Sequence, residues 1–184
     1  LGLELAYHNR AHIVDAVTAL SCLMHATPGL SAESQWTALI AMVGHDLGHQ
    51  GKTNKELQAK QEEITADWVV RCCLSGLPAA QSSQIRRFIE LTDPAVVRLN
   101  HFAYRKKTGD HNLLLQVLIN EADIAASMVP QLAVDLTRAL LKERGNPSPS
   151  AQEVAELYAE FKKSCVLSSD AAQFFLSAKA LGPK

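Results

Sequence analysis

The amino-acid sequence predicts an all-α fold, a compact bundle of roughly eight or nine helices. Apolar residues recur at spacings of three and four, and no two segments alternate like paired strands. Aromatic residues make up only 5% of the chain, while alanine and leucine are abundant, which favours helices over sheets. The 184 residues can bury a substantial core. We therefore expect a single domain over residues 1–184.

The first half of the chain carries clear signals for helix starts and stops. Apolar positions at helical spacing predict a helix over residues 9–26, and Ser31 is a suitable N-cap for a second helix over 32–46. Thr53 and Glu56 have the spacing of a capping box. They begin a predicted long helix, which the breaker segment "GLP" ends.

The second half continues the helical pattern. A helix near residues 80–92 is followed by Asp93 and Pro94, which read as the N-cap and first turn of another short helix. The segment "YRKKTGDHN" is a polar loop, and the apolar helix over 113–129 is closed by Pro130. The remaining helices are expected over residues 131–145, 151–165 and 169–181.

Composition narrows the functional classes. The formal net charge of −1 gives no support for binding nucleic acid or an anionic membrane, and no apolar run is long enough to cross a bilayer. The four cysteines form no C-x-x-C pair and are expected to be buried, reduced thiols of a cytoplasmic protein. Leu1 in place of methionine is compatible with a piece of a longer protein that carries a further regulatory domain.

Two histidines near the start of the chain form the first candidate site. His8 and His12 are four residues apart, so they share one helix face. Such a pair can bind one metal ion together, or one histidine can ligate the ion while the other transfers protons. Two ordinary surface histidines are the alternative.

The segment "GHDLGHQGKTN" follows a nearly apolar helix and carries His45, Asp46 and His49. An aspartate at such a depth needs a charge partner, which a divalent cation would supply. The alternative is that Asp46 caps a turn and pairs with Lys52 or Lys55.

A carboxylate also falls inside the later apolar helix. Asp123 is flanked by core-type residues and is expected to be paired or metal-bound, whereas Glu121 can lie on a solvated face. The combined set has two imidazoles and two carboxylates from three predicted helices and suits Zn, Mn, Fe or Mg. Its members are His12, His45, Asp46 and Asp123.

These motifs resemble those of a known family. "YHNRAHIVDAV" is similar to the Y-H-N-x-x-H-A-x-D-V segment of class I cyclic-nucleotide phosphodiesterases, within the HD superfamily of metal-dependent phosphohydrolases. "HDLGHQGKTN" fits their H-D-x-x-H-x-G-x-x-N pattern, and "IELTDP" and "INEADIAAS" resemble two further segments. The resemblance spans residues 7 to 127 and implies the helical fold of HD and phosphodiesterase domains.

The resemblance also implies a mechanism. Two divalent metal ions, with Asp46 as the bridge between them, would share a hydroxide that attacks phosphorus, and His8 would protonate the leaving oxygen. The first ion would be held by His12, His45, Asp46 and Asp123. The residues expected to orient these ligands and waters are His49, Asn54, Thr92 and Glu63, with Glu62 as the alternative to Glu63.

The segment expected to contact the nucleotide base departs from the family pattern. The resemblance implies that Tyr7 and Gln173 contact a small-molecule nucleotide, but Phe174 and Phe175 follow the glutamine directly instead of three residues later. These three residues either bind the base with altered geometry, or the two phenylalanines pack in the core. A homodimer is also compatible with the resemblance.

Three functions follow from this sequence. The first is hydrolysis of a 3',5'-cyclic nucleotide. The second is hydrolysis of another nucleotide or phosphate ester by an HD phosphohydrolase. The third is a regulatory HD domain that binds metal or nucleotide without turnover. The complete set of ligands together with His8 argues against the third, because a domain freed from catalysis has no need to keep them.

Overall fold

The structure is a computed structural model that describes residues 4–177, and within these residues it is all-helical, as the sequence predicts. It divides the described chain into more helices than expected. The eleven helices are α1 (Arg10–His25), α2 (Ala32–Gly44), α3 (Asn54–Leu57), α4 (Gln61–Cys73), α5 (Ala79–Glu90), α6 (Pro94–Lys106), α7 (His111–Asp123), α8 (Ala125–Met128), α9 (Pro130–Glu143), α10 (Ala151–Ser164) and α11 (Asp170–Leu176).

Two predicted helices are interrupted, and the predicted continuity was wrong there. The capping box of Thr53 and Glu56 is present, but Gln58 adopts a left-handed conformation that ends α3 after one turn, so α4 starts afresh at Gln61. The apolar helix likewise breaks at Ile124, which separates α7 from α8. Asp123 is therefore the last residue of α7 and not an interior one.

Several of the predicted helix caps are confirmed. Ser31 caps α2, Asp93 caps α6 with Pro94 in its first turn, and Ser150 caps α10 through a capping box. Helix α6 is longer than the short helix expected there. The predicted last helix extended to residue 181, and its final residues lie outside the described part of the chain.

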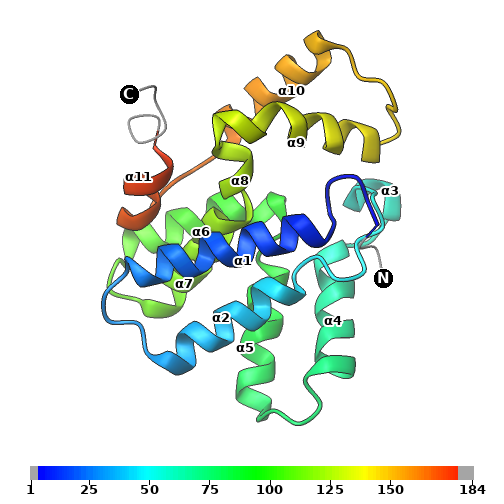
Figure 1. The fold of residues 1–184 in the computed structure, drawn as a ribbon. Helices are drawn as coiled ribbons and strands as arrows, with labels where there is room; N and C mark the ends of the chain where they lie inside the picture. Colours follow the sequence, from blue (N-terminus) through cyan, green and yellow to red (C-terminus); the bar gives the residue numbers. More distant parts are fainter. Residues whose placement is uncertain (1–3, 178–184) are drawn as a thin grey trace.

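Helices α1, α2 and α7 form the centre of the bundle, and each packs against the other two. Figure 1 shows α1 crossing the molecule with α2 beneath it and the α4–α5 pair to one side. Helix α7 is the most deeply placed: all eight residues from Leu115 to Ala122 are buried. The ends of these central helices can therefore hold side chains at fixed positions.

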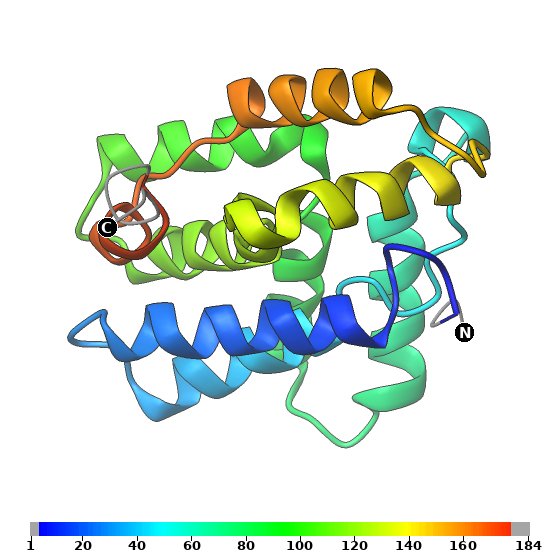
Figure 2. The ribbon, with the colours of Figure 1, turned by 45° about the horizontal axis from the view of Figure 1, so that its top comes forward.

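Helices α9 and α10 form a hairpin over this centre, which lies along the upper edge of the molecule in Figure 1, whereas in Figure 2 α10 lies at the top and α9 below it. Helix α8 connects this hairpin to α7 and also contacts α1. The C-terminal end of α9 and the start of α1 approach each other, because the Glu143 carboxylate accepts the backbone N–H groups of Tyr7 and His8. This closure forms one side of the site described below.

The predictions about buried cysteines and about membrane-spanning segments have different outcomes. All four cysteines are free, but three are exposed and Cys165 is half-buried, so the prediction of buried thiols was wrong. Within residues 4–177, none of the helices has both the length and the apolar character needed to span a bilayer.

Gly44 allows the end of α2 to lie close against α4 and α5. A Cβ atom added there would lie 3.2 Å from a Val69 methyl group and 3.3 Å from the Ile89 Cδ1 atom. We expect Gly44→Val to lower the free energy of unfolding by about 1–3 kcal/mol through overpacking, as measured by urea denaturation. Gly76→Val is the matched control, because no described atom lies within 4 Å of its added Cβ. Equal unfolding midpoints for the two variants would contradict this packing.

Candidate functional site

Four residues from the ends of the three central helices meet at one point. His12 lies in the first turn of α1, His45 and Asp46 follow α2, and Asp123 ends α7. The His12 Nε2 atom lies 3.1 Å from Asp46 Oδ2 and 3.2 Å from Asp123 Oδ1. The His45 Nε2 atom lies 3.1 Å and 3.3 Å from the same two oxygens. The structure thus brings together the four ligands that the sequence suggested.

Local structure fixes these side chains. Asn9 caps α1 by accepting the N–H groups of Ala11 and His12, which sets the first turn that carries His12. The His45 ring is held by its Nδ1 atom, which lies 2.7 Å from the Met42 carbonyl oxygen. Because a carbonyl only accepts, His45 donates from Nδ1, and its Nε2 atom presents a lone pair to the cluster.

The two Nε2 atoms are buried, and neither makes a hydrogen bond to any residue between 4 and 177. Each faces two carboxylate oxygens, so lone pairs point at lone pairs unless a proton or a metal cation lies among them. One donor atom from each of the four residues lies within 4.8 Å of the others. This donor set of two imidazoles and two carboxylates fits Zn²⁺, Mn²⁺ or Fe²⁺.

The electrostatics of the cluster favour positive charge. Burial lowers the pKa of His12, but its contacts with Asp123 and Asp46 raise that pKa to about 9. Burial also opposes ionisation of the two aspartates, yet the neighbouring His45 and His12 hold the pKa of both carboxyls well below the usual range. The two carboxylates therefore stay anionic and attract a cation to the point between the rings.

A second cluster lies beside the first and has a different character. The His8 Nδ1 atom lies 2.5 Å from Glu143 Oε1, and the other carboxylate oxygen accepts the backbone N–H groups of Tyr7 and His8. The His49 ring stacks on His8 with 3.8 Å between ring centroids, and its Nδ1 atom accepts the Gly51 N–H. The stacked rings are nearly parallel and already hydrogen-bonded, so they suit proton handling better than metal ligation.

Glu143 was missed by the sequence reasoning. It lies 135 residues from His8 along the chain, at the end of an amphipathic helix where an acidic residue looks solvated. Its side chain is in fact only 2% exposed. Burial raises its pKa, but the hydrogen bond and charge of His8 outweigh this and lower it to about 2. One signal was available, because a carboxylate in the last turn of a helix opposes the helix dipole and so needs a partner.

Of the residues expected to orient the ligands, some line the cavity and one points to the solvent. Asn54 donates to Glu62 Oε2 at 2.9 Å and accepts the backbone N–H of Gln61 at 2.7 Å. Glu62 lines the cavity over the metal ligands, whereas the side chain of Glu63 is 57% exposed and contacts Lys60. Neighbouring helix positions point about 100° apart, so only one of the two can face the site. The structure favours Glu62, the alternative, over the expected Glu63.

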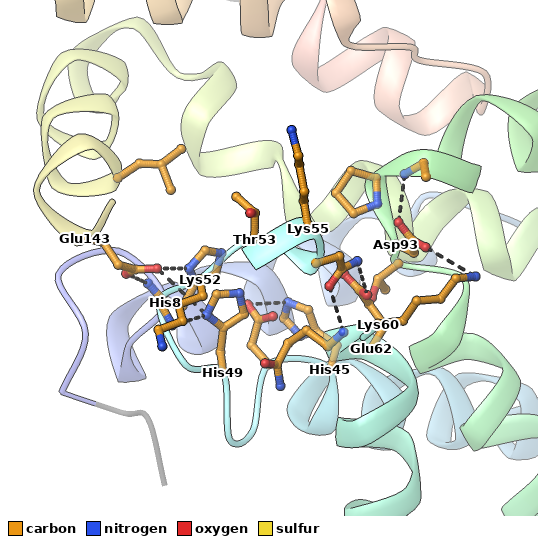
Figure 3. A pocket seen from close by; sticks show the side chains of 18 of the residues that line it. His8, His45, His49, Lys52, Thr53, Lys55, Lys60, Glu62, Asp93 and Glu143 are labelled. Carbon is orange, nitrogen blue, oxygen red and sulfur yellow. Dashed lines mark hydrogen bonds and ion pairs between the residues drawn. The ribbon is translucent and has the colours of Figure 1, made fainter. Parts of the chain in front are cut away.

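His45, Asp46 and Asp123 of the ligand cluster line the floor of a cavity of about 560 Å³. Thr92 is buried in its wall and donates to the Ile89 carbonyl. Figure 3 shows Glu143 beside His8 at one end and Lys60 beside Asp93 at the other. Cationic side chains also line the cavity, and these are Lys52, Lys55, Lys60 and Arg144. The positive charges around an anionic floor suit a phosphate ester held against a metal.

A second, more apolar cavity of about 460 Å³ adjoins the first, and we call it the annex. The two cavities share residues, among them Thr92, Asp123, Leu140 and Arg144. Tyr7 lines the annex, with its hydroxyl 3.0 Å from Ser127 Oγ. The rest of the annex wall comes largely from α9, α10 and the residues that follow α10.

The predicted base-reading residues lie elsewhere. Gln173, Phe174 and Phe175 are on α11, and none of them lines either cavity. The two phenylalanines are 73% and 42% exposed, so they do not pack in the core either. The structure does not bring these three residues to the site.

Comparison with known families gives one match. Residues 7–87 match the sequence model described as 3'5'-cyclic nucleotide phosphodiesterase. The matched segment holds Tyr7, His8, His12, His45 and Asp46, whereas Thr92, Asp123 and Glu143 lie beyond it and join the site only through the fold. No curated protein matches the chain.

Metal binding should depend on the unpartnered Nε2 atoms of the two buried histidines and on the two carboxylates that face them. We expect the purified protein to bind Zn²⁺ or Mn²⁺, with His45→Ala and Asp123→Asn each weakening binding by more than about 100-fold, because loss of even an outer partner costs 10–100-fold. Equilibrium dialysis with elemental analysis measures this. His25→Ala, a change at an exposed histidine at the end of α1, is the control and should bind like wild type. Equal metal content in all four proteins would exclude this site.

Proposed function

Because this chain belongs, through residues 7–87, to the 3'5'-cyclic nucleotide phosphodiesterase family, we propose that its ligand cluster is the reaction centre of a cyclic-nucleotide phosphodiesterase. Membership of the family implies this activity. The observation that carries the assignment to the cluster is the pair of buried, unpartnered Nε2 atoms facing two carboxylates.

The proposed ligands of one metal ion are His12, His45, Asp46 and Asp123, and Asp46 would also be available to a second ion. When bound, divalent metal activates water for attack and neutralises charge on the phosphoryl oxygens. The protein contributes a rigid ligand set with both histidines buried, because three ligands lie at the ends of mutually packed helices. Asn54 and Glu62 form a hydrogen-bonded pair in the cavity wall that can hold water near the ligands.

His8 is the proposed general acid. Its Nδ1–H donates to Glu143, which leaves the Nε2 proton available for the leaving alkoxide oxygen. Glu143 orients the ring through this hydrogen bond, and it is itself fixed by two backbone N–H groups. The stacked His49 ring restricts the rotation of His8. The proton is therefore held in one direction at the edge of the cavity.

The two cavities suit the two parts of a cyclic nucleotide. The cationic rim and the metal ligands fit the phosphodiester, and the apolar annex fits the nucleoside. Arg144 and Asp123 line both cavities, so the phosphate and the nucleoside would meet at this junction. Here α9 and α10 take the part that sequence reasoning assigned to α11.

Hydrolysis of cyclic AMP or cyclic GMP tests the function directly. We expect the metal-loaded protein to release 5'-nucleotide, and Asp123→Asn to lower kcat/KM by at least about 100-fold. A panel with 5'-nucleotides and bis(p-nitrophenyl) phosphate identifies other esterase activities. Turnover of 5'-nucleotides alone would favour a phosphomonoesterase, and nucleotide binding without any turnover would favour a regulatory domain. Full activity in Asp123→Asn would refute the assigned centre.

The acid role of His8 predicts a dependence on the leaving group. For a cyclic nucleotide, which expels an alkoxide, we expect His8→Ala to lower kcat by about 10²–10⁴-fold. The loss should be much smaller with bis(p-nitrophenyl) phosphate, because nitrophenolate leaves without a proton. Glu143→Gln should give the same pattern in weaker form, with metal content unchanged.

His111→Ala serves as the control for these variants, since His111 is exposed at the start of α7. An equal loss on both substrates in His8→Ala would show that His8 acts on metal or substrate binding, not as the acid.

A further inference from the structure

Glu121 is a fully buried carboxylate that the mechanism above does not use. Its exposed fraction is 0%, which overturns the expectation that it lies on a solvated face. A buried carboxylate is costly unless hydrogen bonds satisfy it. Glu121 Oε1 accepts the backbone N–H groups of Ser168 and Ser169, and Oε2 accepts the Ser169 hydroxyl. All of these donors come from a segment that begins more than forty residues later in the chain.

That segment is the non-helical connection from α10 to α11, residues 165–169, which we call the strap. Its backbone N–H groups at Ser168 and Ser169 have no helical ladder to join, so the Glu121 carboxylate supplies their acceptor. The Ser169 hydroxyl also accepts the Ala172 N–H and thereby caps α11. One carboxylate therefore fixes both the strap and the start of the last helix.

Helix α6 holds the strap from a second side. The Ser168 hydroxyl lies 2.9 Å from the buried His101 Nδ1 atom and accepts the Arg105 Nε–H at 2.9 Å. Arg105 also donates to the Leu167 carbonyl oxygen at 3.4 Å. The strap is thus tied to α7 through Glu121 and to α6 through Ser168.

The strap also forms part of the annex. Cys165 and Val166 line the annex together with Phe161 and Ser164 at the end of α10. Glu121 lies on the same helix as Asp123, two residues before this metal ligand. Helix α7 therefore carries both a candidate metal ligand and a carboxylate that holds the strap, which forms part of the annex wall.

We infer that Glu121 is a positioning residue that fixes the strap as a wall of the annex and so sets the affinity for the non-reacting, nucleoside part of the substrate. This inference rests on the proposed function. Glu121 lines neither cavity, so it acts on the substrate through the strap. Loosening the strap weakens ground-state and transition-state binding equally, which raises KM and leaves kcat in place.

The test is Glu121→Gln in the full chain. Glutamine keeps the shape, but it is a neutral acceptor and presents an N–H₂ group toward the Ser169 hydroxyl. We expect KM for the cyclic nucleotide to rise roughly three- to tenfold with kcat within about twofold of wild type. Metal content should be unchanged. Amide hydrogen exchange at Ser168 and Ser169 should accelerate by roughly tenfold.

Two controls separate positioning from general destabilisation. Glu33→Gln makes the same chemical change at an exposed residue of α2 and should leave KM and exchange unaltered. Ile85→Val trims a buried residue of α5 and should lower the melting temperature with no change in KM. If Glu121→Gln does not fold, Ser168→Ala removes the α6 tie instead and should produce the same rise in KM in weaker form.

Unchanged KM and unchanged strap exchange in a folded variant would overturn the inference. A fall in kcat together with lost metal would also overturn it, because Glu121 would then support Asp123 and not the strap. If the wild type turns over no cyclic nucleotide, the proposed function fails by itself. The exchange rates and the binding of 5'-AMP and 5'-GMP would still show whether Glu121 fixes the strap and the annex.

Discussion

Two buried imidazole nitrogens that face two carboxylates form the constraint around which the bundle is arranged. The Nε2 atoms of His12 and His45 and the oxygens of Asp46 and Asp123 lie 3.1–3.3 Å apart without hydrogen bonds at either nitrogen. Such an arrangement is unfavourable without a positive charge, and a shared cation satisfies all four groups. Packing of α1, α2 and α7 holds the four side chains in place. Gly44 lets the end of α2 that precedes His45 lie close against α4 and α5.

The neighbouring histidine cluster shows how similar residues acquire a different role. His8 lies as close to a carboxylate as the candidate metal ligands do, and His49 lies 3.8 Å from the same one, but the Nδ1 atom of each ring already has a partner. The His8 Nδ1 atom is committed to Glu143, and the stacked ring of His49 limits its motion. In the proposed function, the geometry of hydrogen bonds, and not the residue types, separates the proton donor from the metal ligands.

The carboxylates of this protein illustrate three uses of negative charge that is buried or half-buried. Asp46 and Asp123 offer oxygens to a cation, Glu143 holds an imidazole, and Glu121 accepts backbone N–H groups from the strap. Each is satisfied by a different kind of partner. The last two connect distant parts of the chain, so the hairpin of α9 and α10 and the strap become part of the site around the central helices.

The sequence by itself determined the helical class, most helix ends and the four residues of the candidate metal site. These depend on local information: capping side chains such as Ser31, apolar periodicity, and polar residues set within apolar helices. The tertiary structure alone decided the rest. It chose Glu62 over Glu63, buried Glu121, brought Glu143 to His8 and left Gln173 outside the site. Those outcomes depend on which helix faces meet across long sequence separations, and local spacing carries no record of that pairing.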